Sequence, residues 1–217
     1  AHLFEHMAFK GAGSRDARRF AEAIENVGGV MNAGTGYERT SYYARIVAEH
    51  APFALDLIAD ILFEPHWAAD DLEKEKGVVA QERGEAFDIP DDRVFELHQA
   101  ALYPDQALGR PILGEDATLA NVSVDTLRAF HAAHMTPDRV VISIAGAFDR
   151  NALVETAERR FGHLQAGPAQ ALTPARAHGG SASETRKLEQ THLVFSWRGA
   201  PSGSDSSYAL RLMSEIF

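Results

Sequence analysis

The strongest local constraint on this chain is its opening segment, His2-Leu3-Phe4-Glu5-His6. Successive residues of an α-helix rotate by about 100° around the axis, so positions i, i+3 and i+4 share one stripe of its surface. A short helix over residues 3–10 would therefore bring His2, Glu5 and His6 to one side. Two imidazoles arranged in this way can bind one metal ion while the carboxylate between them faces the same ion. The segment predicts a metal site on a helix.

The composition limits which ligands such a site can use. The chain has 217 residues and no cysteine, so any metal must be held by His, Asp or Glu. The hydrophobic share of 45% is ordinary for a globular protein and is enough for a sizeable core. A net charge of −10 argues against nucleic acid as a partner. The sequence has no run of apolar residues long enough for a transmembrane helix, so no membrane span is predicted.

A third metal ligand should come from another element, because catalytic zinc is commonly bound by three protein ligands and one open position. The predicted helix 71–86 places two apolar and two acidic residues on one face, namely Leu72, Glu75, Val79 and Glu82. Burying ionised carboxylates costs several kcal/mol unless a cation or hydrogen-bond donors compensate. Glu75 and Glu82 are therefore candidate ligands. The alternative is a solvated helix with Glu–Lys pairs, which Lys74 and Lys76 would fit.

Hydrophobic periodicity and turn residues predict a mixture of helices and strands. Further helices are expected over residues 14–26, 52–63, 92–102, 123–134, 151–161 and 205–217. Strands are expected over residues 30–35, 40–47, 139–145 and 192–197. This pattern favours an α+β fold, a layered domain with a mostly antiparallel sheet covered by helices, followed by the start of a second similar domain.

The opening AHLFEHMAFKG resembles the active-site signature of the zinc metallopeptidase family of mitochondrial processing peptidase, pitrilysin and insulin-degrading enzyme. The resemblance continues through MNAGTGYERTSYY, LGRPILG and IAGAFD, and it covers essentially the whole chain. It is nearest to the bacterial and mitochondrial processing-peptidase branch. It implies a zinc-dependent metalloendopeptidase, with one zinc ion, that hydrolyses peptides or presequence-like extensions.

The resemblance also implies residue roles. His2, His6 and Glu82 would bind the zinc, since Glu82 follows His6 at the spacing of the family's third ligand. Glu5 would act as general base, taking a proton from the metal-bound water as that water attacks the peptide carbonyl. Glu75 matches a second family carboxylate and would either orient a ligand or form a structural ion pair.

The segment Asn32-Ala33-Gly34-Thr35 resembles the family's substrate-binding edge strand, on which an extended peptide pairs by β-augmentation. An ordinary Gly-containing strand is the alternative. The H-x-x-H pair His131 and His134 has no nearby carboxylate at ligand spacing, so both are predicted to be surface residues.

Family members carry roughly forty or more residues before the motif, including strands of the same sheet, and continue beyond the position of Phe217. We therefore expect residues 1–164 to be a catalytic zinc-binding domain without its N-terminal strands. Residues 165–187 would be a linker and residues 188–217 the beginning of a second, truncated homologous domain. The expected partners are a peptide substrate and a homologous subunit, in a homodimer or a heterodimer. The Ala- and Arg-rich composition favours the bacterial cytoplasm or periplasm over the mitochondrial matrix.

Two other functions fit part of this pattern. A non-catalytic subunit, like the core proteins of respiratory complexes, would share the fold but typically loses motif residues, whereas His2, Glu5, His6 and Glu82 are all present. A scaffold that binds zinc only for stability would usually supply four protein ligands, and here three and a base are found.

Overall fold

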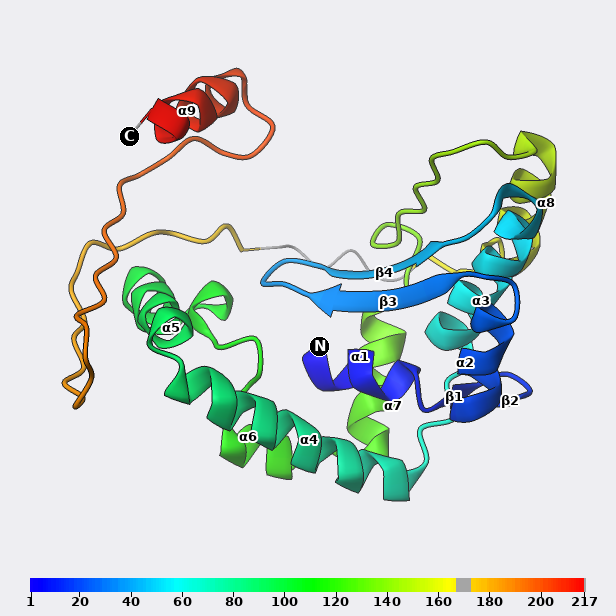
Figure 1. Ribbon diagram of the computed structural model, residues 1–217, viewed down its shortest axis with the longest axis horizontal. Helices are drawn as coiled ribbons and strands as arrows, with labels where there is room; N and C mark the ends of the chain where they lie inside the picture. The colour runs from blue at the N-terminus through cyan, green and yellow to red at the C-terminus, as the bar shows by residue number, and fades with distance from the viewer. Residues whose placement is uncertain (167–172, 217) are drawn as a thin grey trace. The chain divides into compact units, whose positions relative to one another are not determined.

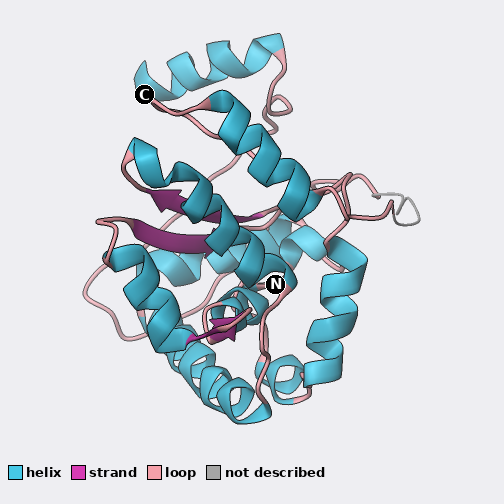
Figure 2. Cartoon of the chain, turned by 90° about the vertical axis from the view of Figure 1, so that its right-hand side faces the viewer, coloured by secondary structure: helices cyan, strands magenta, loops and turns pink. Residues whose placement is uncertain are grey.

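The computed structural model describes residues 1–166 and 173–216, so part of the predicted linker 165–187 lies outside the described residues. The chain divides into two compact units. The first comprises residues 1–85 and 111–173, and the second comprises residues 86–110 and 174–217. About half of the chain is helical and the sheets are small and antiparallel, which confirms the predicted α+β class (Figure 2).

The first unit contains most of the described secondary structure. Its strands are β1 (Gly11–Ala12), β2 (Arg15–Asp16), β3 (Val30–Thr35) and β4 (Thr40–Arg45). Its helices are α1 (His2–Ala8), α2 (Ala17–Glu25), α3 (Ala51–Phe63), α4 (Ala69–Asp88, residues 69–85 within this unit), α6 (Asp116–Ala120), α7 (Val124–His134) and α8 (Arg150–Phe161), with a 3₁₀ turn at Ala48–His50. The second unit holds α5 (Pro90–Leu102), a 3₁₀ turn at Ala107–Gly109 and α9 (Asp205–Ile216).

Helix α1 is held by its apolar face. Leu3, Phe4 and Met7 are buried and pack in one hydrophobic cluster with Leu72 and Val79 of α4. Because these residues occupy one side of the helix, the opposite stripe with the two histidines of the motif is kept out of the core. In Figure 1, α1 lies between α4 and the hairpin formed by β3 and β4.

The β3–β4 hairpin is antiparallel, and its register runs from Val30 opposite Arg45 to Thr35 opposite Thr40. Burial alternates along both strands, as expected when successive side chains point to opposite faces. Both predicted strands are confirmed here, although β4 ends at Arg45 instead of residue 47. The partly buried face carries Met31, Ala33, Thr35, Thr40, Tyr42 and Ala44.

A second core joins α2, α3 and α8 with the hairpin, and Leu57 and Ile61 of α3 are fully buried in it. The buried carboxylate of Asp60 receives guanidinium hydrogen bonds from Arg15, at 2.9 Å, and from Arg160. Two cations thus offset part of the cost of burying this charge and tie α3 to β2 and α8.

Two predicted strands, residues 139–145 and 192–197, are wrong for this structure. Neither segment is a strand, and Val141 and Trp197 are 90% and 84% exposed. A strand exists only where a neighbouring strand takes up its backbone hydrogen bonds, and no strand of residues 1–166 or 173–216 pairs with either segment. The apolar pattern predicted two strands, but neither segment has a neighbouring strand with which to pair in the described part of the chain.

None of the helices in the described part of the chain combines the length and the apolar character needed to cross a bilayer.

Candidate metal centre

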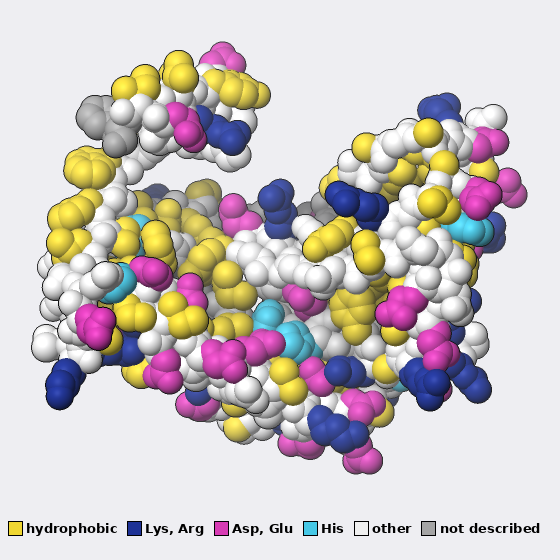
Figure 3. Space-filling view, in the orientation of Figure 1, with side chains coloured by type: hydrophobic (Ala, Val, Ile, Leu, Met, Phe, Trp, Pro, Cys, Tyr) yellow, Lys and Arg dark blue, Asp and Glu magenta, His cyan; other side chains and the backbone are white. Residues whose placement is uncertain are grey.

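The structure brings together His2 and His6 of α1 with Glu82 of α4. One ligand atom from each of the three residues lies within 4.8 Å of the others. The Glu82 Oε2 atom is 3.7 Å from His2 Nε2 and 3.6 Å from His6 Nε2. All three side chains are partly buried, and Figure 3 shows His and acidic side chains lying together at the surface over α1 and α4.

The packing of α1 on α4 explains this convergence. Val79 lies three residues before Glu82, so the two side chains share one face of α4. Burial of Val79 and Leu72 against α1 therefore turns Glu82 toward the histidine stripe. The same apolar contacts that stabilise the helix pair also set the distances between the three candidate ligands.

Glu75 contacts both a ligand and a cation. Its side chain is only 8% exposed; Oε2 lies 3.0 Å from His6 Nδ1 and Oε1 lies 2.6 Å from Lys10 Nζ. An ionised carboxylate can only accept hydrogen bonds, so His6 Nδ1 is the donor and the Nε2 lone pair is free toward Glu82. Both roles left open for Glu75, ligand orientation and ion pairing, are therefore compatible with its contacts.

Lys10 was missed at the sequence level. The predicted burial of Glu75 could have pointed to Lys10, because a buried carboxylate requires a cation or a hydrogen-bond donor nearby. Lys10 lies four residues after His6, just beyond the end of α1. Its spacing could thus have identified it as the partner of Glu75.

The surroundings of His2 favour the neutral form of its imidazole. Burial lowers the pKa of His2, the neighbouring His6 lowers it further, and the charges of Glu82 and Glu5 partly oppose these effects. A neutral imidazole is the form that binds a metal. Two imidazole nitrogens and one carboxylate oxygen, with no thiolate, are a donor set typical of catalytic zinc, so these residues fit the implied metal.

Glu5 lies on the same stripe of α1 but outside the three-residue cluster. Its Oε2 accepts a hydrogen bond from the Thr35 hydroxyl at the end of β3. Burial, followed by the negative charge of Glu5, raises the pKa of Tyr42 on the neighbouring strand. The structure thus places Glu5 between the candidate ligands and the inner face of the hairpin.

The segment Asn32–Thr35 lies in β3, with β4 paired along one edge. Among residues 1–166 and 173–216, no strand pairs with the other edge. A Cβ atom added at Gly34 would meet no atom within 4 Å, so the space over the exposed face of the strand is open at this residue. Of the four residues, Thr35 is the one that reaches the metal centre, through Glu5.

The prediction that His131 is a surface residue is wrong. His131 is partly buried, its Nε2 lies 2.7 Å from the Leu62 carbonyl oxygen, and its ring contacts Phe4 and Trp67. Through these contacts His131 packs against the buried face of α1. His134 is also partly buried, and Arg139 contacts its Nδ1 atom at 2.8 Å.

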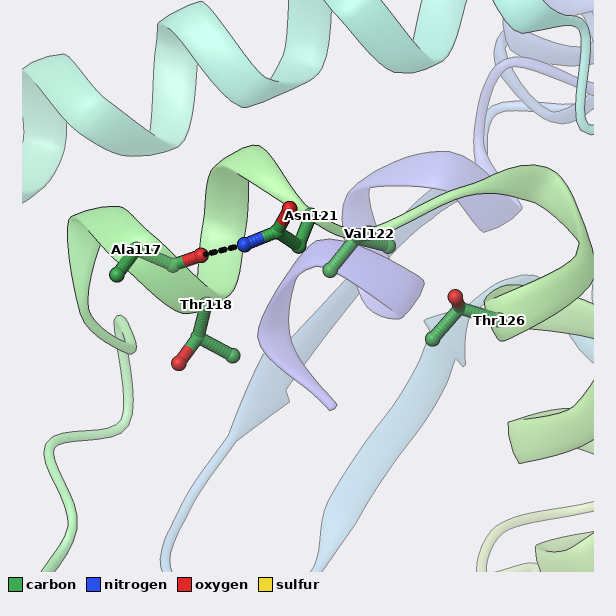
Figure 4. A pocket seen from close by; sticks show the side chains of 5 residues that line it. All are labelled: Ala117, Thr118, Asn121, Val122 and Thr126. Atoms are coloured by element: carbon green, nitrogen blue, oxygen red, sulfur yellow. Dashed lines mark hydrogen bonds between the residues drawn. The ribbon is translucent and has the colours of Figure 1, made fainter.

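A depression over α6 and α7 offers no comparable chemistry. It is lined by Ala117, Thr118, Asn121, Val122 and Thr126 (Figure 4). The Asn121 amide donates to the Ala117 carbonyl oxygen at 2.7 Å, and the lining has no titratable side chain. We assign no function to this surface.

Comparisons with protein families match the two parts of the chain separately. Residues 1–116 match the family described as insulinase, peptidase family M16, and residues 121–217 match the M16 peptidase inactive domain. Every candidate catalytic or metal-binding residue lies in the first of these segments.

Relatives from bacteria cover the whole chain. A protein named "Uncharacterized zinc protease" from Rickettsia felis is 37% identical over 218 residues, and "Uncharacterized zinc protease YmxG" from Bacillus subtilis is 38% identical over 217 residues. Each alignment covers 100% of this chain and 53% of the relative, so the chain spans about half the length of these proteins.

Solved structures share the fold. A protease from Helicobacter pylori superposes with a TM-score of 0.71 at 21% identity, over 81% of this chain and 42% of that one. An M16 inactive-domain protein from Pseudomonas fluorescens gives a TM-score of 0.70 at 22% identity, over 79% of this chain and 42% of that one.

Proposed function

The chain belongs to the insulinase family of peptidases, family M16, and on that premise we propose that it is the zinc-binding half of a metalloendopeptidase. The observation that carries the proposal is the approach of two imidazole nitrogens and one carboxylate oxygen to within 4.8 Å, with a further carboxylate on the same helical stripe. The names of the bacterial relatives support zinc and proteolysis.

In this proposal His2, His6 and Glu82 hold one zinc ion. When bound, the metal polarises a peptide carbonyl and makes a water molecule more acidic. Glu5 takes a proton from the attacking water and passes it to the leaving amine, which is general base and then general acid catalysis. Glu75 keeps the His6 imidazole in the tautomer that leaves Nε2 free.

The peptide would bind to the free edge of β3 at Asn32–Thr35. Main-chain hydrogen bonds hold an added strand, which suits a substrate without fixed sequence. The unpaired edge of β3 supports this proposal, because a second backbone can form hydrogen bonds there without displacing any strand of residues 1–166 or 173–216.

The chain covers 53% of each of the two bacterial relatives, so the activity of the whole protein is itself part of the proposal. We propose that residues 188–217 begin a second homologous domain after the linker 165–187, and that residues 1–164 form the catalytic one. Cleavage of presequence-like extensions, assembly with a homologous subunit and location in the bacterial cytoplasm or periplasm belong to the same proposal.

The test is the Glu5→Gln variant of the intact protein. It should retain stoichiometric zinc and lose about 10²- to 10⁴-fold in kcat, because it keeps the ligands and removes the base. Glu73→Gln is the matched control, since it removes the same charge from an exposed position of α4, where Glu73 pairs with Lys76 and with no other side chain of residues 1–166 and 173–216. This control should hydrolyse a reporter peptide at the wild-type rate.

Near-normal turnover by Glu5→Gln at stoichiometric zinc would refute the assignment of the base. A wild-type protein that binds zinc and hydrolyses no peptide would instead favour the non-catalytic subunit.

A further inference from the structure

We propose that the hydroxyl groups of Thr35 and Thr40 position the Glu5 carboxylate, so that the hairpin that binds the peptide also holds the general base. The inference rests on the proposed function and adds two positioning residues to it. Neither hydroxyl would touch the reacting atoms, because both act through Glu5.

The three side chains form a continuous chain of contacts. Thr35 Oγ1 donates to Glu5 Oε2, and Thr40 Oγ1 lies 3.1 Å from Thr35 Oγ1. The two threonines face each other as the final residue pair of the hairpin, Thr35 on β3 and Thr40 on β4. Both lie on the partly buried face of the hairpin, which is the side that meets α1.

The direction of these hydrogen bonds follows from the chemistry of the groups. A general base is an ionised carboxylate, which only accepts hydrogen bonds. Thr35 has one hydroxyl hydrogen and donates it to Glu5, so Thr40 must be the donor to Thr35. The result is a directed chain, Thr40 to Thr35 to Glu5, in which each hydroxyl is oriented by its neighbour.

This arrangement leaves one carboxylate oxygen for catalysis. The Thr35 hydroxyl occupies Oε2 of Glu5, and no other hydrogen bond to this side chain occurs in the described part of the chain. The second oxygen, Oε1, is therefore free to take a proton. A hydrogen bond to a charged acceptor is roughly twice as strong as one between neutral groups, so it restricts the rotation of Glu5 effectively.

Peptide binding and base positioning use different atoms of Thr35. Side chains of a strand stand perpendicular to the sheet, whereas a pairing peptide contacts the backbone at the strand edge. The Thr35 hydroxyl can therefore hold Glu5 while its backbone pairs with substrate. A peptide that orders β3 would also steady the base, which links substrate binding to catalysis.

The first test measures kcat, KM and zinc content of the intact protein. Thr35→Val has the shape of threonine without the hydroxyl, and we expect it to lower kcat by about 10- to 100-fold with zinc content unchanged and KM within about 3-fold. Thr35→Ser restores the hydroxyl and should recover kcat to within about 3-fold of wild type. Thr40→Val should have a smaller effect, about 3- to 10-fold. Ser41→Ala removes a hydroxyl from the opposite face of β4 and serves as control.

A positioning role also predicts dependence on Glu5. In the Glu5→Gln background, Thr35→Val should cause no further loss of kcat, because there is no base left to position. An unchanged kcat in Thr35→Val, an equal loss in Thr35→Ser, or a full additional loss in the double variant would each overturn the inference.

The second test needs no activity. Urea unfolding of the metal-free protein is compared for wild type, Thr35→Val, Glu5→Ala and the double variant of these two, because alanine, unlike glutamine, keeps no oxygen that could accept the Thr35 hydrogen bond. We expect the midpoint shift of the double variant to be smaller than the sum of the two single shifts, whereas additive shifts would refute the contact. If the wild type hydrolyses no peptide, the proposed function fails, and this cycle still decides whether Thr35 holds Glu5.

Discussion

Replacing Glu75 by Gln should weaken zinc binding without weakening the fold. The wild-type carboxylate accepts a hydrogen bond from His6 Nδ1 at 3.0 Å and contacts Lys10 Nζ at 2.6 Å. Glutamine keeps the size of the side chain and removes its charge. His6 then loses the anionic acceptor that makes its Nε2 atom a more basic ligand.

The expected magnitude follows from these contacts. Loss of an outer-shell partner of a metal-bound histidine typically costs about 10- to 100-fold in metal affinity, or about 1.4 to 2.8 kcal/mol. The unfolding free energy of the metal-free protein should change by less than about 1 kcal/mol, because two effects offset the loss of the charged contacts. The variant no longer buries a charge, and Lys10, whose side chain is 34% exposed, can return to water.

The assay is competition for zinc with a chromophoric chelator, together with urea unfolding of the metal-free protein. Glu73→Gln on the same helix is the control for loss of one negative charge, because Glu73 pairs with Lys76 and contacts neither imidazole in the described structure. A zinc affinity of Glu75→Gln within about 3-fold of wild type would refute the claim that Glu75 orients His6.

Three further predictions concern the packing and the titration of the first unit. Met7→Ala should destabilise the protein by about 2–5 kcal/mol in urea unfolding, because Met7 is fully buried between α1 and α4; a loss below about 1 kcal/mol would contradict this packing. Ser123→Ala should cost about 0.5–2 kcal/mol in the same assay by removing the capping box of α7, and an unchanged midpoint would show that the cap is unimportant. Burial and the charge of Arg139 lower the pKa of His134 below 6.5 in the folded protein. As the pH falls below 6.5, the unfolded state therefore binds the proton before the folded state does. The free energy of unfolding decreases until the pH has passed the folded-state pKa. His134→Gln should therefore lose less stability than wild type between about pH 7.5 and about pH 5.5, and equal losses would contradict the assignment.

The helices, and the faces by which they pack, could be predicted from the sequence because the spacing of apolar residues along the chain determines both. The motif stripe of α1 and the acidic face of α4 follow from the helical period, and the structure brings both faces together. The choice of Glu82 as third ligand required the family resemblance, since the period alone also allowed Glu75. Metal binding by these residues stays a prediction.

Contacts between distant elements were less accessible from the sequence. None of the expected strands covers residues 11–12, yet these residues pair with Arg15 and Asp16 in a short hairpin. The hydrogen bond from Thr35 to Glu5 joins residues 30 positions apart, so no local pattern predicts it. The same limit explains the two predicted strands that have no partner, because periodicity describes the segment itself and not its neighbour.

The central claim is that His2, His6 and Glu82 bind a single zinc ion, and crystallography of the zinc-loaded intact protein tests it most directly. Anomalous diffraction on the two sides of the zinc absorption edge locates the metal independently of the protein atoms. We predict one peak, about 2.0–2.2 Å from His2 Nε2, His6 Nε2 and a Glu82 carboxylate oxygen. A zinc peak bound elsewhere, or one at the histidines with Glu82 more than about 8 Å away, well beyond coordination distance, would contradict the account.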